Sequence, residues 1–89
     1  KVDIAVIGCS ALDVEGDILD YDIHEVGVSR ALIAQARHAW LVMDHSKLSR
    51  KAPARIASLR ELDRMFTDRA LPAPLMERCK HWQTPVLIG

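Results

Sequence analysis

Four side chains in this sequence are suited to holding a small ligand that carries hydroxyl or anionic groups: Ser10, Asp13, Glu25 and Lys47. An ammonium group is a compact charge with three hydrogen-bond donors, which suits Lys47 to a phosphate group. Carboxylates accept hydrogen bonds from sugar hydroxyls and can also take up a proton as general bases. The alternatives are a surface role for Lys47 and a helix-capping role for Glu25. We favour ligand binding for Lys47 because of where its loop is expected to lie.

Two short apolar runs are expected to position these residues. Ile4 to Ile7 is followed by a glycine, and Ala39 to Met43 is followed by a polar turn. Such runs are typical of strands buried on both faces of a sheet that helices cover. With a helix between them they predict a strand–helix–strand unit, which has parallel strands and a right-handed crossover in nearly all cases. Both strands then end at one edge of the sheet, so Ser10, Asp13 and Lys47 should point into one crevice.

The stretch between these strands predicts a helix that begins at Ile23. Asp22 is a favourable N-cap residue, and Glu25, three residues later, completes a variant of the capping box. We expect the helix to run toward Arg37 and His38, whose positive charges favour the negative end of the helix dipole.

The apolar residues of this helix form a stripe that would cover one face of the sheet. Gly27 weakens the helix by about 1 kcal/mol relative to alanine. We expect this glycine to let the helix approach a strand closely.

The remaining segments complete an α/β fold. Val14 to Asp22 is interpreted as a long loop, of a kind that tends to be functional, and Leu48 to Ser58 as a basic, irregular segment. A helical turn, a third strand, a second helix and a fourth strand then follow: Ser58 to Glu61, Leu62 to Thr67, Pro72 to Trp82 and Val86 to Ile88. The β-α-β-β-α-β order predicts an open, mostly parallel sheet with flanking helices.

The length of the chain indicates one domain or less. It has 89 residues, whereas most domains have about 100 to 150. It lacks an initiator methionine, enters a strand almost at once and ends on a strand-like run. We therefore expect residues 1–89 to be a single domain or a fragment of a longer protein, with part of any ligand site outside them.

Charges are unevenly distributed although their formal sum is zero. Lys1 to Glu25 is acidic, and Arg30 to Arg60 is basic with Asp44 as its only acid. One interpretation is that two solvated surfaces of opposite charge fold against each other. The other is that residues Lys47 to Arg55 supply cations to an anionic ligand. Net neutrality argues against direct nucleic-acid binding by this segment, which would need a basic face.

Cysteine usage and hydropathy point to a cytoplasmic protein. Cys9 and Cys79 lie outside any C-x-x-C pattern, so neither disulfides nor a zinc site are indicated, and a reducing cytosol is the default. Cys9 is interpreted as a buried small apolar residue in preference to a reactive thiol. No apolar run approaches the roughly 18 to 20 residues of a membrane span.

Common enzyme and metal motifs fail at the loop after the first strand. A nucleophile elbow needs glycine where Leu12 stands, and a dinucleotide fingerprint needs glycine at Ser10 and Asp13. The second histidine of a zincin motif would fall on Val28, and the acidic residues lack the alternation of a calcium loop. No cofactor or metal is therefore expected.

Taken together, the motifs resemble the C-terminal sensor domain of the DeoR family of bacterial transcriptional regulators. The resemblance rests on Gly8 to Asp13 (GCSALD), Gly16, Glu25 at a helix start, Asp44 to Leu48 (DHSKL) and Leu62 to Asp68 (LDRMFTD). Typical members read close to GASGID, DSSKF and ITD, so His45 and Leu48 depart from the pattern. The resemblance implies a cytoplasmic, homo-oligomeric regulator, usually a repressor, that binds a phosphorylated sugar or polyol. It also implies operator DNA bound by an upstream helix-turn-helix domain.

These sensor domains are similar in turn to ribose-5-phosphate isomerase, so the chain would be the Rossmann-like half of a phosphosugar isomerase-like fold. By that likeness Glu25 stands at the position of the isomerase base and Lys47 at that of a phosphate-side lysine. Ser10 replaces an isomerase aspartate, and Leu19 to Asp22 replaces a glycine-rich loop. We therefore expect an effector-sensing domain without enzymatic activity. The alternatives are a sugar-phosphate isomerase-like enzyme fragment and a purely structural oligomerisation fragment.

A mechanism for sensing follows from the two charged segments. If Asp13 and Glu25 contact the sugar while Lys47 holds the phosphate, the ligand would tie Val14–Asp22 to Leu48–Arg55. Ordering of a mobile acidic loop would then be the free-energy difference that the effector exploits.

Overall fold

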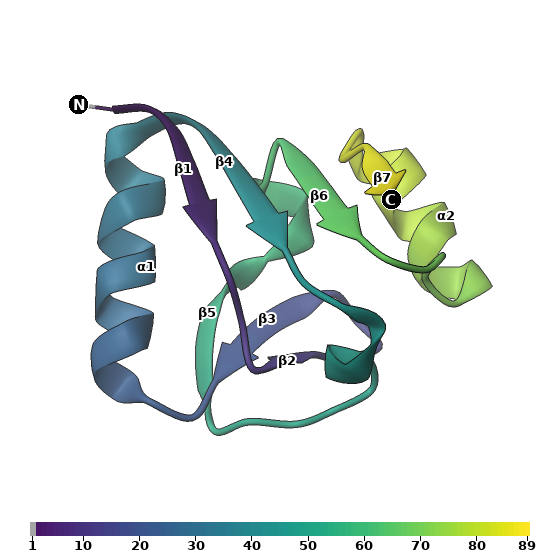
Figure 1. Cartoon of the computed structure of the whole chain (residues 1–89), viewed down its shortest axis with the longest axis horizontal. Coiled ribbons are helices and arrows are strands. Elements are labelled where there is room, and N and C mark those ends of the chain that lie inside the picture. Colours follow the sequence, from purple (N-terminus) through teal and green to yellow (C-terminus); the bar gives the residue numbers. More distant parts are fainter. Residues whose placement is uncertain (1) are drawn as a thin grey trace.

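A computed structural model describes residues 2–89 as a mixed α/β fold (Figure 1). Its elements are, in order, β1 (Val2–Ile7), β2 (Ala11–Leu12), β3 (Asp17–Asp20), α1 (Ile23–Gln35), β4 (Ala36–Val42), the 3-10 turn η1 (His45–Lys47), β5 (Ala54–Ser58), the 3-10 turn η2 (Leu59–Glu61), β6 (Arg64–Thr67), α2 (Ala73–Trp82) and β7 (Val86–Ile88).

The larger sheet confirms the expected open parallel arrangement. It has four strands in the order β1-β4-β6-β7, and all three neighbouring pairs are parallel. α1 lies alongside β1 and β4, and α2 lies at the other side of the sheet (Figure 1). The third and fourth strands and the second helix of the prediction correspond to β6, β7 and α2. The carboxyl ends of all four strands therefore meet at one edge of this sheet.

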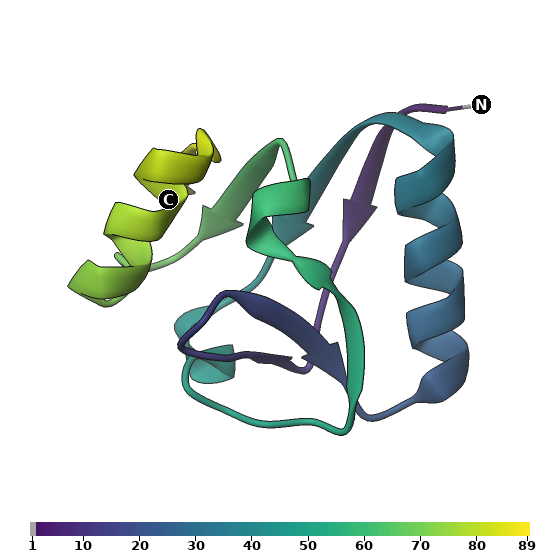
Figure 2. The same cartoon turned by 180° about the vertical axis from the view of Figure 1, so that it is seen from behind.

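A second sheet contradicts two of the sequence-based interpretations. β2, β3 and β5 form a three-stranded antiparallel sheet, so Val14–Asp22 is not a long structureless loop and Leu48–Ser58 is not irregular throughout. β3 pairs with β2 on one side and with β5 on the other, and Ile18 lies opposite Ala57. Seen from behind, β5 leads from this small sheet into η2 (Figure 2). The parallel sheet and its helices follow the predicted β-α-β-β-α-β order (β1, α1, β4, β6, α2, β7), and the small sheet is an addition to it.

The strand β1 is not buried on both faces as predicted. Ala5 and Ile7 are buried in the core, whereas Val2, Ile4 and Val6 are 44 to 57% exposed. Among residues 2–89, α1 covers only one side of β1, and no element packs over the opposite apolar side. The alternation in burial follows from the period of two residues in a strand.

The start of α1 agrees with the prediction, but its end does not. Asp22 is the N-cap, and its side chain accepts a hydrogen bond from the backbone N–H of His24 at 2.8 Å. The expected capping box with Glu25 is absent, because the Asp22 N–H donates to Asp20 instead. The helix ends at Gln35, and the extended backbone of Ala36 begins β4. Arg37 and His38 therefore belong to a strand and not to the last turn of the helix.

Within the core, the interior side of α1 contributes less than its sequence suggested. Val26, at 5% exposure, is the only buried residue of α1, and Ile23 is 70% exposed. The core is instead built by both sheets, η2 and α2, with Leu12, Ile18, Leu41, Leu59, Met65 and Cys79 fully buried. This packing joins the two sheets into one hydrophobic cluster.

Two glycines give a matched test of this packing. Gly16 has a φ of +89°, and a Cβ there would lie 3.0 Å from the Trp82 ring. Gly16→Ala should therefore lower the free energy of unfolding by about 1–2 kcal/mol, the usual cost of a left-handed backbone with a side chain. Gly27, which was expected to permit close helix–strand contact, has nothing within 4 Å of such a Cβ. Gly27→Ala should stabilise by up to about 1 kcal/mol. Urea denaturation of the intact protein measures both, and equal effects would contradict this account.

Candidate functional site

The turn that follows β4 holds Lys47 at the carboxyl edge of the parallel sheet. Asp44 caps this turn: its Oδ1 accepts from the backbone N–H of Ser46 at 2.8 Å and from the Ser46 hydroxyl. These two bonds, helped by nearby Lys47, keep the pKa of the Asp44 carboxyl below its usual range. Asp44 is thus ionised at neutral pH, and Lys47 is half-buried at the end of a turn with fixed backbone geometry.

His45 and Asp68 bind this turn to the end of the neighbouring strand β6. The backbone N–H of His45 donates to Asp68 Oδ1 at 2.7 Å, and the imidazole Nδ1 lies 2.8 Å from Asp68 Oδ2. The side-chain hydrogen bond to His45 is the main cause that lowers the pKa of Asp68. Neither residue was expected from the sequence to contact a ligand. The signals in the sequence were the departure at His45 from the family pattern and the position of Asp68 directly after a strand.

Cys9 lies where the end of β1, the end of β3 and η1 come together. Burial is the main cause that raises the pKa of its thiol to about 11, and the Asp20 carboxylate raises it further while Lys47 opposes this. Cys9 is therefore a neutral thiol at physiological pH, which agrees with an apolar role and not with a reactive one. The charges of Asp20, Lys47 and Asp44 all affect the pKa of this thiol, so the three side chains lie around Cys9.

Ser10 follows Cys9 directly and is half-buried. Its backbone N–H donates to the carbonyl of Leu19 at 3.0 Å, so the small sheet fixes the backbone at this position. The structure thereby places Ser10 at the carboxyl end of β1, on the loop that enters β2. That is the edge from which Lys47 also projects, because β1 and β4 are parallel neighbours.

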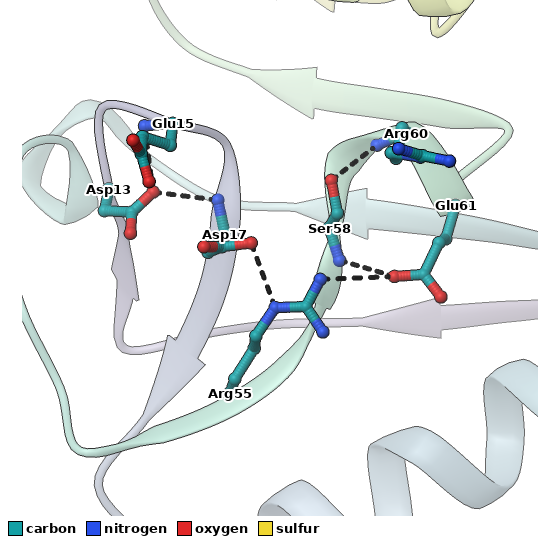
Figure 3. Close-up of polar contacts among 7 residues, drawn as sticks. All are labelled: Asp13, Glu15, Asp17, Arg55, Ser58, Arg60 and Glu61. Carbon is teal, nitrogen blue, oxygen red and sulfur yellow. Dashed lines mark hydrogen bonds and ion pairs between the residues drawn. The ribbon is translucent and has the colours of Figure 1, made fainter.

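Asp13 has a structural task in the turn between β2 and β3. Its Oδ1 accepts from the backbone N–H groups of Glu15 at 3.0 Å and Asp17 at 2.8 Å (Figure 3). A carboxylate used in this way stabilises the turn through two charge-assisted hydrogen bonds. If Asp13 contacts a ligand, its side chain does so while the backbone N–H groups of Glu15 and Asp17 hold it in place.

Arg55 connects the acidic and basic segments beside this turn. Its guanidinium lies 3.0 Å from Asp17 Oδ1 and 3.7 Å from Glu61 Oε2 (Figure 3). Glu61 also accepts from the backbone N–H of Ser58 at 2.7 Å and closes the capping box of η2. Segments of opposite charge thus meet through β3 and β5, as one of the two sequence-based interpretations expected.

Glu25 is exposed in the first turn of α1. The beginning of α1 and η1 lie at opposite ends of the small sheet (Figure 1). No hydrogen bond or ion pair among residues 2–89 joins Glu25 to Lys47 or to Ser10. The structure therefore gathers Ser10 and Lys47 at one edge, with Asp13 one turn away, and leaves Glu25 separate.

Two surface hollows are large enough for a small ligand. One, of about 410 Å³, lies at the carboxyl ends of β4, β6 and β7 and is bordered by Asp68, Thr67 and Met43. The other, of about 650 Å³, is largely apolar and lies beside α2. Neither Lys47 nor Ser10 lines either of these two hollows. In open α/β sheets ligands bind outside the carboxyl ends of the strands, which favours the smaller hollow. Within residues 2–89 no cluster of side chains could hold a metal ion, and neither helix is long and apolar enough to cross a membrane.

The fold and this edge define an open parallel α/β domain, a class in which small ligands bind outside the carboxyl ends of the strands. The family model described as the DeoR C terminal sensor domain matches residues 1–69, so the chain belongs to this family. The resemblance found in the sequence motifs is confirmed. The described fold is thus that of a DeoR-type sensor domain.

Several curated bacterial regulators are similar to the chain. The chain is 38% identical over 88 residues, 99% of its length, to the glycerol-3-phosphate regulon repressor of Haemophilus influenzae. It is 38% identical over 77 residues to the repressor of the same name in Escherichia coli and 28% identical over 88 residues to the E. coli HTH-type transcriptional repressor CsqR. The chain spans about a third of the length of these relatives, 34, 31 and 34% respectively.

Proposed function

We propose that this domain binds a phosphorylated polyol or sugar, with glycerol 3-phosphate as the first candidate, and thereby changes the operator affinity of a helix-turn-helix domain in the intact protein. The observation that carries the proposal is the capped turn that holds Lys47 at the carboxyl edge of the parallel sheet. A lysine with fixed backbone geometry at this edge is suited to a phosphate group. The names of the two most similar repressors cited above suggest the polyol.

The four residues singled out from the sequence have distinct places in this proposal. Lys47 contacts the phosphate, and Ser10 faces it from the neighbouring strand end. Asp13 Oδ1 is already bonded within its turn, so Oδ2 accepts hydrogen bonds from hydroxyl groups of the ligand. Glu25 would contact the sugar from the start of α1. Because α1 begins at the other end of the small sheet from Lys47, this contact requires the ligand, or a segment outside residues 2–89, to span that distance.

The proposal includes no catalytic step. Ser10 stands where the isomerase pattern has an aspartate, and Leu19–Asp20 lies in β3, where the pattern has a glycine-rich loop. The relatives are transcriptional regulators, in line with sensing in place of turnover. We further propose that the intact regulator works in the cytoplasm as a homo-oligomer without a cofactor.

Ligand-induced stabilisation of the intact protein tests this function. Glycerol 3-phosphate at 100 times its dissociation constant should stabilise the protein by about 2.7 kcal/mol, and the thermal midpoint should rise accordingly. Glycerol at the same concentration serves as the matched control without phosphate, and ribose 5-phosphate tests the sugar alternative. The same ligand should change the affinity of the intact protein for operator DNA, either weakening or strengthening it, in a mobility-shift assay. If no phosphorylated polyol or sugar stabilises the protein, the proposed function is wrong.

A further inference from the structure

One face of the parallel sheet, called the open face below, carries apolar side chains that no element of residues 2–89 covers. They alternate along the strands with residues of the core and are Ile4, Val6, Trp40, Val42, Phe66 and Leu87. Val6 is 57% exposed and Val42 is 48% exposed, whereas Leu41, on the opposite face, is fully buried. A contiguous exposed apolar patch of this kind marks an interaction surface.

The centre of the open face is aromatic. The ring centroids of Trp40 and Phe66 lie 5.3 Å apart, and the register places Val6 beside Trp40 and Val42 beside Phe66. Arg64 reaches over Trp40, with its guanidinium carbon 5.5 Å from the ring centroid. Trp and Arg are enriched among the residues that carry the binding free energy of protein interfaces. The open face is therefore suited to contact with another protein element.

A helix is the element that fits this surface. All three neighbouring pairs of strands are parallel, and parallel sheets occur almost only where helices cover both faces. The face opposite the open one packs against α1. Four strands spaced about 4.8 Å apart span roughly 14 Å, and a helix about 10–12 Å in diameter covers most of that width.

The free edge of β1 also favours a helix on the open face. β1 pairs with β4 on one side, and no strand of residues 2–89 pairs with its other side. From β1 to β7 the chain crosses the sheet in one direction, with α1 on one face. A chain that extends the sheet away from the free edge of β1 runs in the opposite direction. Right-handed crossovers then place its helices on the open face.

We propose that an amphipathic helix from a part of the intact protein outside residues 1–89 packs on the open face, with apolar residues at the spacing i, i+3, i+4 and i+7. Such a part is expected from the relatives, because the match covers 34% of the Haemophilus influenzae repressor and leaves about two-thirds of its length outside. A helix of the same chain also competes well against a second copy, since a linked segment has an effective concentration of about millimolar.

This helix would also enclose the hollow at the carboxyl ends of β4, β6 and β7. Val42, Phe66 and Leu87 belong both to the open face and to the lining of that hollow of about 410 Å³. Packing on the open face therefore places the helix along one side of the hollow. The inference goes beyond the proposed function, because it concerns how the domain is completed and does not depend on which ligand binds.

Thiol labelling of the intact protein tests the inference. Val6→Cys places a thiol on the open face, and Val14→Cys, in the turn between β2 and β3, is the matched control, because these valines are 57 and 66% exposed. Under a packed helix Val6→Cys should react at least about 100-fold more slowly than Val14→Cys, since its reaction requires local opening. Peptide mass spectrometry reads each site separately from Cys9 and Cys79. Val42→Cys replaces Val6→Cys if that variant does not fold.

Photo-cross-linking identifies the covering segment. An aliphatic amino acid with a diazirine group, incorporated in place of Val6, should cross-link within one chain to a segment outside residues 1–89 that has the helical apolar spacing. A cross-link between two chains would mean that a second copy covers the face, and a cross-link to a segment without that spacing would mean another element. Either result overturns the inference, as does a smaller difference between the labelling rates. Both experiments are made without an effector, so they are independent of the proposed function.

Discussion

Lys47→Ala should weaken binding of glycerol 3-phosphate to the intact protein about tenfold to about 150-fold, which corresponds to a loss of about 1.5–3 kcal/mol for one charge-assisted hydrogen bond. The loss is expected because Lys47 is the lysine that the capped turn holds at the carboxyl edge of the parallel sheet. Binding of glycerol itself, which has no phosphate, should be poor and unchanged. Isothermal calorimetry at constant pH and ionic strength measures both affinities.

Lys51→Ala is the matched control for this substitution. Lys51 is exposed in the segment before β5, and its recorded contact, from the Tyr21 hydroxyl, is to its backbone carbonyl, which alanine retains. Its removal changes the net charge by the same amount as Lys47→Ala and should leave the affinity within about twofold, since distant surface charges are screened. Equal losses in both variants would mean that the protein attracts the phosphate through its overall charge, and Lys47 would have no special role.

The parts of the fold that could be predicted are those with a local signature. β1, β4 and β7 are short apolar runs bounded by polar turns, and Asp22 is a residue type that starts helices. The end of α1 has no such signature. No glycine or proline marks Ala36, and the chain passes directly from helix into β4. Only pairing with β1 fixes that boundary, and pairing between distant segments is invisible in a local pattern.

The small sheet was missed for the same physical reason. β2 has two residues and β3 has four, with an aspartate at each end of β3. Neither segment shows the alternation or length that indicates a strand, and β3 is formed because β5, far along the chain, pairs with it. Short strands of this kind depend on tertiary contacts more than on intrinsic propensity.

The residues of the candidate site also fall into those that a local sequence pattern predicts and those that depend on distant contacts. Lys47 could be placed at the carboxyl edge from the run before it, because parallel strands end together. The His45–Asp68 pair could not, since it joins residues 23 positions apart and depends on β6 lying next to β4. Asp13 was expected to face a ligand, and its backbone hydrogen bonds to Glu15 and Asp17 appeared only with the structure.

Ile18→Ala decides between the loop that the sequence suggested and the strand that the structure contains. Ile18 is fully buried in β3 and belongs to the core cluster, so its truncation should lower the free energy of unfolding by about 2–5 kcal/mol. Val14→Ala is the matched control in the same segment, because Val14 is 66% exposed and should change stability by no more than about 0.5 kcal/mol. Urea denaturation of the intact protein measures both.

Equal, small effects would show that Val14–Asp22 is mobile, and ligand-induced ordering of that segment would again explain sensing. A large, selective loss for Ile18→Ala would mean that β3 is already ordered without effector. The effector would then have to act on a part of the protein other than β3, because the ion pair of Asp17 with Arg55 and the pairing with β5 hold β3 in place.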